Sequence, residues 1–108
     1  MKYFCSKEKR TGSCYVEFCG VNNSELWDDS SIFIDDELMG EIGLTKVITE
    51  VIPTFDPYGA PITINQCQWQ KIKELANGEE ACREALKEIE VWAEDNLRKN
   101  QAFKILGV

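Results

Sequence analysis

The sequence predicts one α+β domain, in which a small antiparallel sheet has three to four helices packed on one side. Aromatic and β-branched runs divided by turn residues fill much of residues 2–34, a pattern typical of an N-terminal hairpin and short strands. From residue 65 to residue 99, apolar residues recur instead at helical spacing. The 108 residues, 44% hydrophobic and 29% charged, suit a single domain (residues 1–108) whose helices gather on one face of the sheet.

The N-terminal segment, residues 1–20, is predicted to form a β-hairpin. Its strands would be residues 3–5 and 14–19, and the turn between them, residues 9–13, contains a glycine that favours a tight reversal. Residues 31–34 are predicted to form a third, short strand because their sequence, Ser-Ile-Phe-Ile, is aromatic and β-branched.

Helical signals follow the third strand. Asp35 or Asp36 can cap a short helix, because a carboxylate at a helix N-terminus accepts backbone N–H groups. Residues 44–52 place four apolar side chains on one helical face, although their β-branched content leaves a strand as the alternative. Pro53 ends that segment, and residues 54–61, with two prolines and a glycine, are predicted to be a loop.

The helical pair, residues 65–99, has the clearest local signals. Asn65 can cap the first helix, and Gln68 is placed to return the hydrogen bond as a capping box. The apolar residues that recur along this helix are predicted to form its buried stripe: Trp69, Ile72, Leu75 and Ala76.

The second helix of the pair is predicted from about residue 79 to residue 99. One side of it is apolar, and Glu84 and Glu88 form a like-charge pair four residues apart. Residues 102–108 are too apolar for a loose terminus, so we expect them to dock as a last strand or along the helical layer.

The five cysteines are predicted to be buried free thiols: Cys5, Cys14, Cys19, Cys67 and Cys82. Their number is odd, their spacing is irregular, and the chain contains neither a C-x-x-C pair nor a histidine. The usual zinc frameworks are therefore missing. The alternative is a metal or redox site formed by the first three cysteines on neighbouring strands.

The first residues contain no apolar core of a signal peptide. No run approaches the roughly 18 apolar residues of a transmembrane helix. The sequence therefore predicts a cytoplasmic protein without a membrane partner.

The formal charge of −7 is concentrated in the acidic segment, residues 25–58. Between Glu25 and Asp56 the sequence has nine acidic residues and a single base, Lys46. Such a surface repels phosphate backbones and anionic lipids and attracts cationic partners. It therefore indicates a basic protein partner rather than nucleic acid, with a solvated face that maintains solubility as the alternative.

No catalytic, cofactor or metal site is predicted. The chain lacks histidine, the most frequent general base, and no signal marks any thiol as an activated nucleophile. Paired carboxylates at residues 28–29 and 35–37 could serve acid–base chemistry or hold Mg²⁺, but such acids are more often solvated or capping. Neither phosphate-binding pattern, G-x-x-x-x-G-K-[ST] or G-x-G-x-x-G, occurs.

Four short stretches carry a family resemblance: residues 31–37 (SIFIDDE), 53–59 (PTFDPYG), 64–69 (INQCQW) and 103–108 (FKILGV). Over residues 31–108 the chain resembles small bacterial immunity proteins paired with contact-dependent growth inhibition (CDI) or related polymorphic toxins. The resemblance implies a cytoplasmic, non-catalytic and often acidic α+β protein. It also implies a 1:1 complex with the C-terminal toxin domain of a cognate effector, frequently a basic nuclease, whose active site or a nearby surface is covered.

The candidate partner-binding residues combine acidic side chains with aromatic rings able to anchor an interface. They are Trp27, Asp28, Asp29, Asp35, Asp36, Glu37, Phe55, Asp56 and Tyr58. Core packing is the alternative for Trp27 and Phe55, whereas Tyr58, in the proline-rich loop, is expected to be exposed. The alternative functions are an acidic phage-type inhibitor of a host nuclease, a small acidic adaptor domain, and an enzyme that holds a divalent ion.

Overall fold

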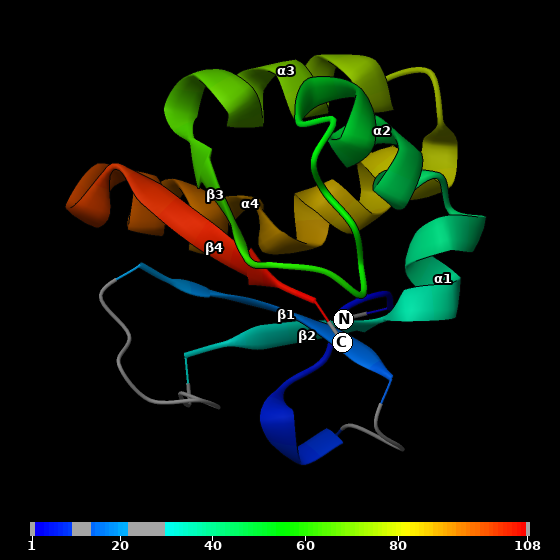
Figure 1. Cartoon of the computed structure of the whole chain (residues 1–108), viewed down its shortest axis with the longest axis horizontal. Coiled ribbons are helices and arrows are strands. Elements are labelled where there is room, and N and C mark those ends of the chain that lie inside the picture. Colours follow the sequence, from blue (N-terminus) through cyan, green and yellow to red (C-terminus); the bar gives the residue numbers. More distant parts are fainter. Residues whose placement is uncertain (1, 10–13, 22–29, 108) are drawn as a thin grey trace.

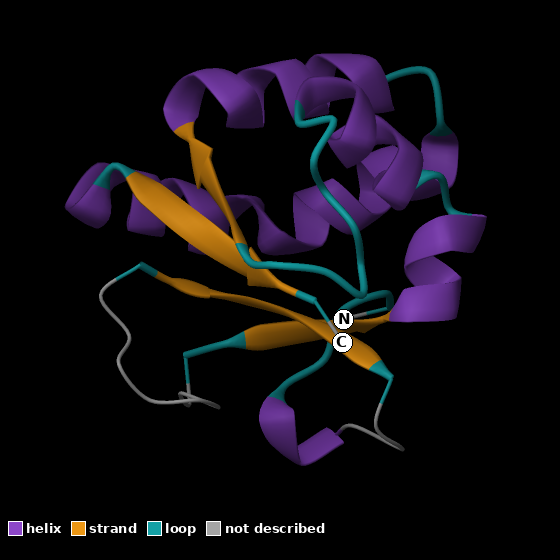
Figure 2. Ribbon diagram, in the orientation of Figure 1, coloured by secondary structure: helices purple, strands orange, loops and turns teal. Residues whose placement is uncertain are grey.

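A four-stranded antiparallel sheet with the strand order β2-β1-β4-β3 is the base of the fold (Figure 1). The computed structural model describes residues 2–9, 14–21 and 30–107. Along the chain the elements are η1 (Lys7–Lys9), β1 (Tyr15–Gly20), β2 (Ile32–Asp35), α1 (Asp36–Glu41), α2 (Leu44–Val51), β3 (Ile62–Asn65), α3 (Gln66–Ala76), α4 (Glu80–Asn100) and β4 (Ala102–Leu106). Figure 2 shows α2, α3 and α4 together on one side of the sheet, with the short 3-10 helix η1 on the other. The α+β class predicted from the sequence is confirmed.

The register of the strands places apolar side chains beneath the helices. Phe18 of β1 lies opposite Ile105 of β4, and Ile64 of β3 lies opposite Phe103 of β4. Directly opposed residues of antiparallel strands point to the same face of a sheet. Phe103 stacks on Phe18 with ring centroids 6.1 Å apart and meets Trp69 of α3 edge-on at 5.8 Å. Each such ring pair adds about 0.5–1.5 kcal/mol beyond the burial of its area. The first pair joins β1 to β4, and the second attaches α3 to the sheet.

The predicted N-terminal hairpin is wrong in its pairing. Cys5 donates its N–H to Phe33 O at 2.8 Å and accepts the Phe33 N–H at 2.9 Å, so this segment lies beside β2 rather than β1. The two neighbours of β1 are β2 and β4, which occupy both of its edges. The turn at residues 9–13 predicts pairing of residues 3–5 with residues 14–19, which are close in sequence. In the fold, β4 from the other end of the chain pairs with β1 instead.

The helix predictions and the C-terminal strand are confirmed, with one strand added. Asn65 and Gln68 form the capping box at the start of α3, with N–O distances of 2.8 and 2.9 Å. The apolar tail forms β4 in the interior of the sheet, between β1 and β3. The unpredicted strand is β3: its four residues follow the turn-rich loop directly and give only a short β signal.

Glu88 of α4 holds the N-terminal segment against the helical layer. Its carboxylate accepts the backbone N–H groups of Lys2 at 2.6 Å and of Tyr3 and Phe4 at 3.0 Å each. The hydroxyl of Tyr3 donates to Glu84 at 3.0 Å. Donors from the N-terminus therefore offset the like-charge repulsion between the two glutamates and bring the ring of Phe4 into the core.

Candidate functional site

The acidic residue just before α1 caps the helix. Asp35 is the N-cap, and its Oδ1 accepts the N–H groups of Glu37 at 2.9 Å and Leu38 at 3.2 Å. A carboxylate in this position satisfies backbone donors that have no partner within the helix and interacts favourably with the helix dipole. The half-buried Asp35 is thus occupied locally, whereas the side chain of Glu37 is exposed.

Tyr58 joins the proline-rich loop to α1. Its hydroxyl donates to Asp36 Oδ2, and its backbone N–H donates to Asp56 Oδ1 at 2.9 Å. The ring nevertheless remains 67% exposed. The hydrogen bond to Asp36, followed by the charge of that carboxylate, raises the pKa of the Tyr58 phenol, because both disfavour a phenolate at this position.

The C-terminal end of the chain supports the same loop. A Cβ added to Gly107 would lie 2.7 Å from Pro57 O and 3.0 Å from Gly59 O, closer than side-chain carbons approach backbone oxygens. Glycine at this position therefore allows the loop to sit directly on the end of the chain.

This arrangement presents an exposed aromatic side chain with two carboxylates near its hydroxyl and a third bound to its backbone N–H. We call it the Tyr58 cluster, and it comprises Asp36, Glu37, Asp56 and Tyr58. Its members come from the start of α1 and from a loop about twenty positions further along the chain. The cluster therefore unites four of the nine residues that the sequence nominated for partner binding.

Phe55 is not available as an interface anchor, which corrects its place among the candidates. Its side chain is 6% exposed and belongs to the hydrophobic core, because a turn after α2, in which Phe55 N–H donates to Ile52 O at 2.9 Å, directs the ring inward. The remaining candidates, Trp27, Asp28 and Asp29, lie outside the described residues.

A groove beside α2 adds residues that the candidates do not include. Leu75 of α3, predicted to be buried, is 45% exposed, because it lies at the edge of the buried face of α3 that Trp69 and Ile72 form. The side chains and glycine that line this groove are Glu41, Ile42, Gly43, Lys46, Val47, Glu50, Leu75 and Glu79. Two acids of the groove, Glu41 and Glu50, belong to the acidic segment that the sequence shows. The third, Glu79, belongs to the helical pair and is brought beside them only by the fold.

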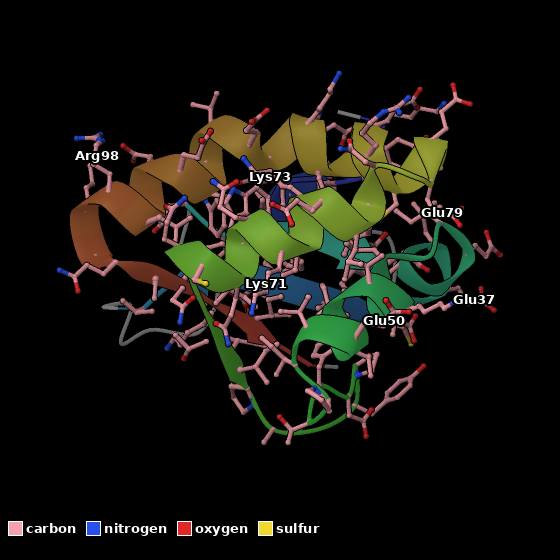
Figure 3. The ribbon with its side chains drawn as sticks, turned by 90° about the horizontal axis from the view of Figure 1, so that it is seen from above. Glu37, Glu50, Lys71, Lys73, Glu79 and Arg98 are labelled. Atoms are coloured by element: carbon pink, nitrogen blue, oxygen red, sulfur yellow. The ribbon has the colours of Figure 1, made fainter. Side chains whose placement is uncertain are left out.

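Charge is unevenly distributed over the helical layer. Figure 3 shows Glu37, Glu50 and Glu79 gathered at one end of this layer, Lys71 and Lys73 over its middle, and Arg98 at the other end. We call these three glutamates the acidic end. They come from α1, α2 and the residue that precedes α4, so the acidity of the middle third of the sequence continues on the folded surface.

The cysteines differ more in exposure than the sequence predicts. Cys19 and Cys82 are buried and Cys5 is half-buried, but Cys14 and Cys67 are exposed, because they stand just before β1 and on the outer face of α3. Burial, together with the charge of Glu79, raises the pKa of the Cys82 thiol to about 11. Cys82 is therefore protonated at neutral pH and unsuited to act as a nucleophile.

Within the described ranges, no three histidine, cysteine, aspartate or glutamate side chains lie close enough together to hold a metal ion. Of the helices in the same ranges, none combines the length and the apolar composition needed to cross a lipid bilayer. Comparison with protein-family models, curated proteins and solved structures finds no match to this chain.

Proposed function

We propose that this protein is an immunity protein of a CDI or related polymorphic toxin system. In this role it is a non-catalytic cytoplasmic inhibitor that binds the C-terminal toxin domain of a cognate bacterial effector 1:1 and neutralises it. The observation that carries the proposal is the Tyr58 cluster: an exposed tyrosine side chain whose hydroxyl donates to Asp36 and lies near Glu37, and whose backbone N–H donates to Asp56. Tyrosine is enriched among the residues that dominate binding energy, and complementary charge around it favours a basic partner.

The acidic surface gives the proposed inhibitor a way to compete with substrate. A toxin domain that cleaves nucleic acid must be cationic where it holds phosphates. A protein that presents carboxylates to that region occupies the position of the phosphates and is drawn to it by long-range attraction. Screening shortens that attraction from about 8 Å at physiological salt to about 3 Å at 1 M, so the association rate should fall as salt rises.

Charge reversal at the acidic end tests the proposal. Glu37 and Glu50 are exposed on α1 and α2, so Glu37→Lys combined with Glu50→Lys alters the surface without removing a buried contact. The matched control is Glu8→Lys combined with Glu94→Lys, two exposed acids on η1 and α4 whose reversal changes the net charge by the same amount.

The measurement is the association rate with the toxin domain encoded beside this protein. We expect the variant at the acidic end to associate about tenfold more slowly than the control variant, because only its charges face the basic partner. Equal rates for the two variants would mean that net charge alone attracts the partner and that the acidic end is not the interface.

A further inference from the structure

A positively charged pocket lies between α3 and α4 of this acidic protein. It is about 260 Å³ in volume and is lined by Lys73, Ala76, Asn77, Arg83, Leu86, Lys87 and Glu90. Three of these seven residues are cations and one is an acid. Ala76 and Leu86 are 0% and 4% exposed, so they form an apolar floor beneath the charged side chains.

The single acid of the pocket already has a partner. Glu90 Oε1 lies 3.7 Å from Lys73 Nζ, and the same ammonium group lies 5.6 Å from the centre of the Trp69 ring. Lys73 is therefore held in place from two sides, and the carboxylate of Glu90 is drawn toward α3. The other two cations, Arg83 and Lys87, are exposed, and Glu90 is paired with neither of them.

Arg83 and Lys87 stand four residues apart on α4 and repel each other. Arg83 Nη1 donates to the carbonyl oxygen of Asn77 at 3.3 Å, which orients the guanidinium toward the end of α3. Among the residues that the structure describes, neither cation belongs to an ion pair, since those pairs are Lys73–Glu90, Arg98–Asp95 and Lys99–Asp95.

The other like-charge pair of α4 shows how such repulsion is relieved in this fold. Glu84 and Glu88, also four residues apart, accept hydrogen bonds from Tyr3 and from the backbone of the N-terminal segment. Arg83 and Lys87 face a pocket instead of a chain segment. An anion in that pocket would relieve their repulsion in the same way.

We propose that the pocket between α3 and α4 binds a small organic anion. Its carboxylate or phosphate group lies between Arg83 and Lys87, since guanidinium and ammonium groups are the usual donors to such oxygens. Its apolar part contacts the floor formed by Ala76 and Leu86. The volume is just below the range of about 300–1,000 Å³ for drug-sized ligands, which limits the ligand to a small molecule.

This site is distinct from the Tyr58 cluster, and the proposal does not depend on the proposed function. The site borders the acidic end at Glu79, whose carbonyl oxygen accepts the Arg83 N–H at 2.9 Å. Figure 3 shows Lys73 over the middle of the helical layer, away from Glu37 and Glu50 at the acidic end.

The test is a titration of ¹⁵N-labelled protein with benzoate and with phenyl phosphate at low ionic strength, followed by amide chemical shifts. Benzyl alcohol serves as the uncharged probe. We expect saturable shifts confined to residues 73–77 and 83–90 with at least one of the two anions, and none with benzyl alcohol. The stronger of the two anions identifies the acid group that the pocket prefers. Shifts that do not saturate with either anion, or equal shifts with benzyl alcohol, would overturn the proposal.

A matched pair of variants assigns the binding to the pocket. Arg83→Gln combined with Lys87→Gln should weaken anion binding at least tenfold. Arg98→Gln combined with Lys99→Gln removes the same charge from the last turn of the same helix and should change it less than twofold. Equal weakening in both variants would show general electrostatic attraction and refute the pocket. Lys87→Gln alone, at an exposed residue, gives the same comparison should the double variant fold poorly.

Discussion

Replacing Glu88 by alanine tests the attachment of the N-terminal segment to α4. The carboxylate accepts three backbone N–H groups, those of Lys2, Tyr3 and Phe4, at 2.6 to 3.0 Å. A hydrogen bond to a charged group contributes about 1.5–3 kcal/mol when it is shielded from water. These donors are exposed or partly buried, so water can replace the carboxylate as their hydrogen-bond partner. We therefore expect the free energy of unfolding to fall by about 2–3 kcal/mol in total. Alanine is the best helix former, so α4 itself is preserved.

Thermal and urea denaturation measure the effect of Glu88→Ala. For a domain of about 100 residues, each 1 kcal/mol lowers Tm by about 4–8 °C, so the expected decrease is about 8–24 °C. The control is Glu94→Ala, at an exposed position on the same helix. If the two variants unfold within about 0.5 kcal/mol of each other, which is the range of ordinary surface substitutions, Glu88 does not hold the N-terminus.

Three further outcomes are expected. Tyr58→Ala should weaken toxin binding about 30-fold in calorimetry while Tm stays nearly constant. The control, Val91→Ala, changes a side chain that is 83% exposed on α4 and should leave the affinity unchanged. A greater loss of affinity in Val91→Ala than in Tyr58→Ala would reject Tyr58 as an anchor. Folding raises the pKa of the Cys82 thiol from 9.0 to about 11, so above pH 9 ionisation of this thiol favours the unfolded state. Between pH 9 and pH 11 the parent protein should therefore lose stability in urea denaturation, and Cys82→Ala should lose less. Gly107→Ala should destabilise the fold by about 1–3 kcal/mol, because the added Cβ meets Pro57 O at 2.7 Å, and an unchanged Tm would contradict that contact.

The parts of the fold that depend on neighbouring residues could be predicted from the sequence. The caps at Asp35 and Asn65 satisfy donors two or three positions away, so residue type and spacing suffice to locate them. The partners of β1 depend on the whole chain, because an apolar strand from either end can pair with it. The local turn predicted that residues 3–5 would pair with β1, but in the fold β4 is the strand that pairs there.

The candidate site was predicted in part for a related reason. Phe55 and Tyr58 lie three positions apart in one loop, with no periodicity to assign a face, yet one ring is 6% exposed and the other 67%. Phe55 lies on a local turn, in which its N–H donates to Ile52 O, and its ring enters a core formed by the whole chain. Tyr58 is joined instead to Asp36, which lies 22 positions earlier in the chain. Glu79 reaches the acidic end only because α3 packs along α2 and ends just before this residue (Figure 3).

The proposed function is tested most directly by growth rescue. The toxin domain encoded immediately upstream of this protein is expressed in a test bacterium, with and without this protein, and growth is recorded. We expect full growth with the parent protein and a clear loss of protection with Tyr58→Ala at equal protein level, since that side chain is exposed and its removal leaves the core intact. Growth arrest despite abundant, folded parent protein would contradict the proposal that this chain is an immunity protein.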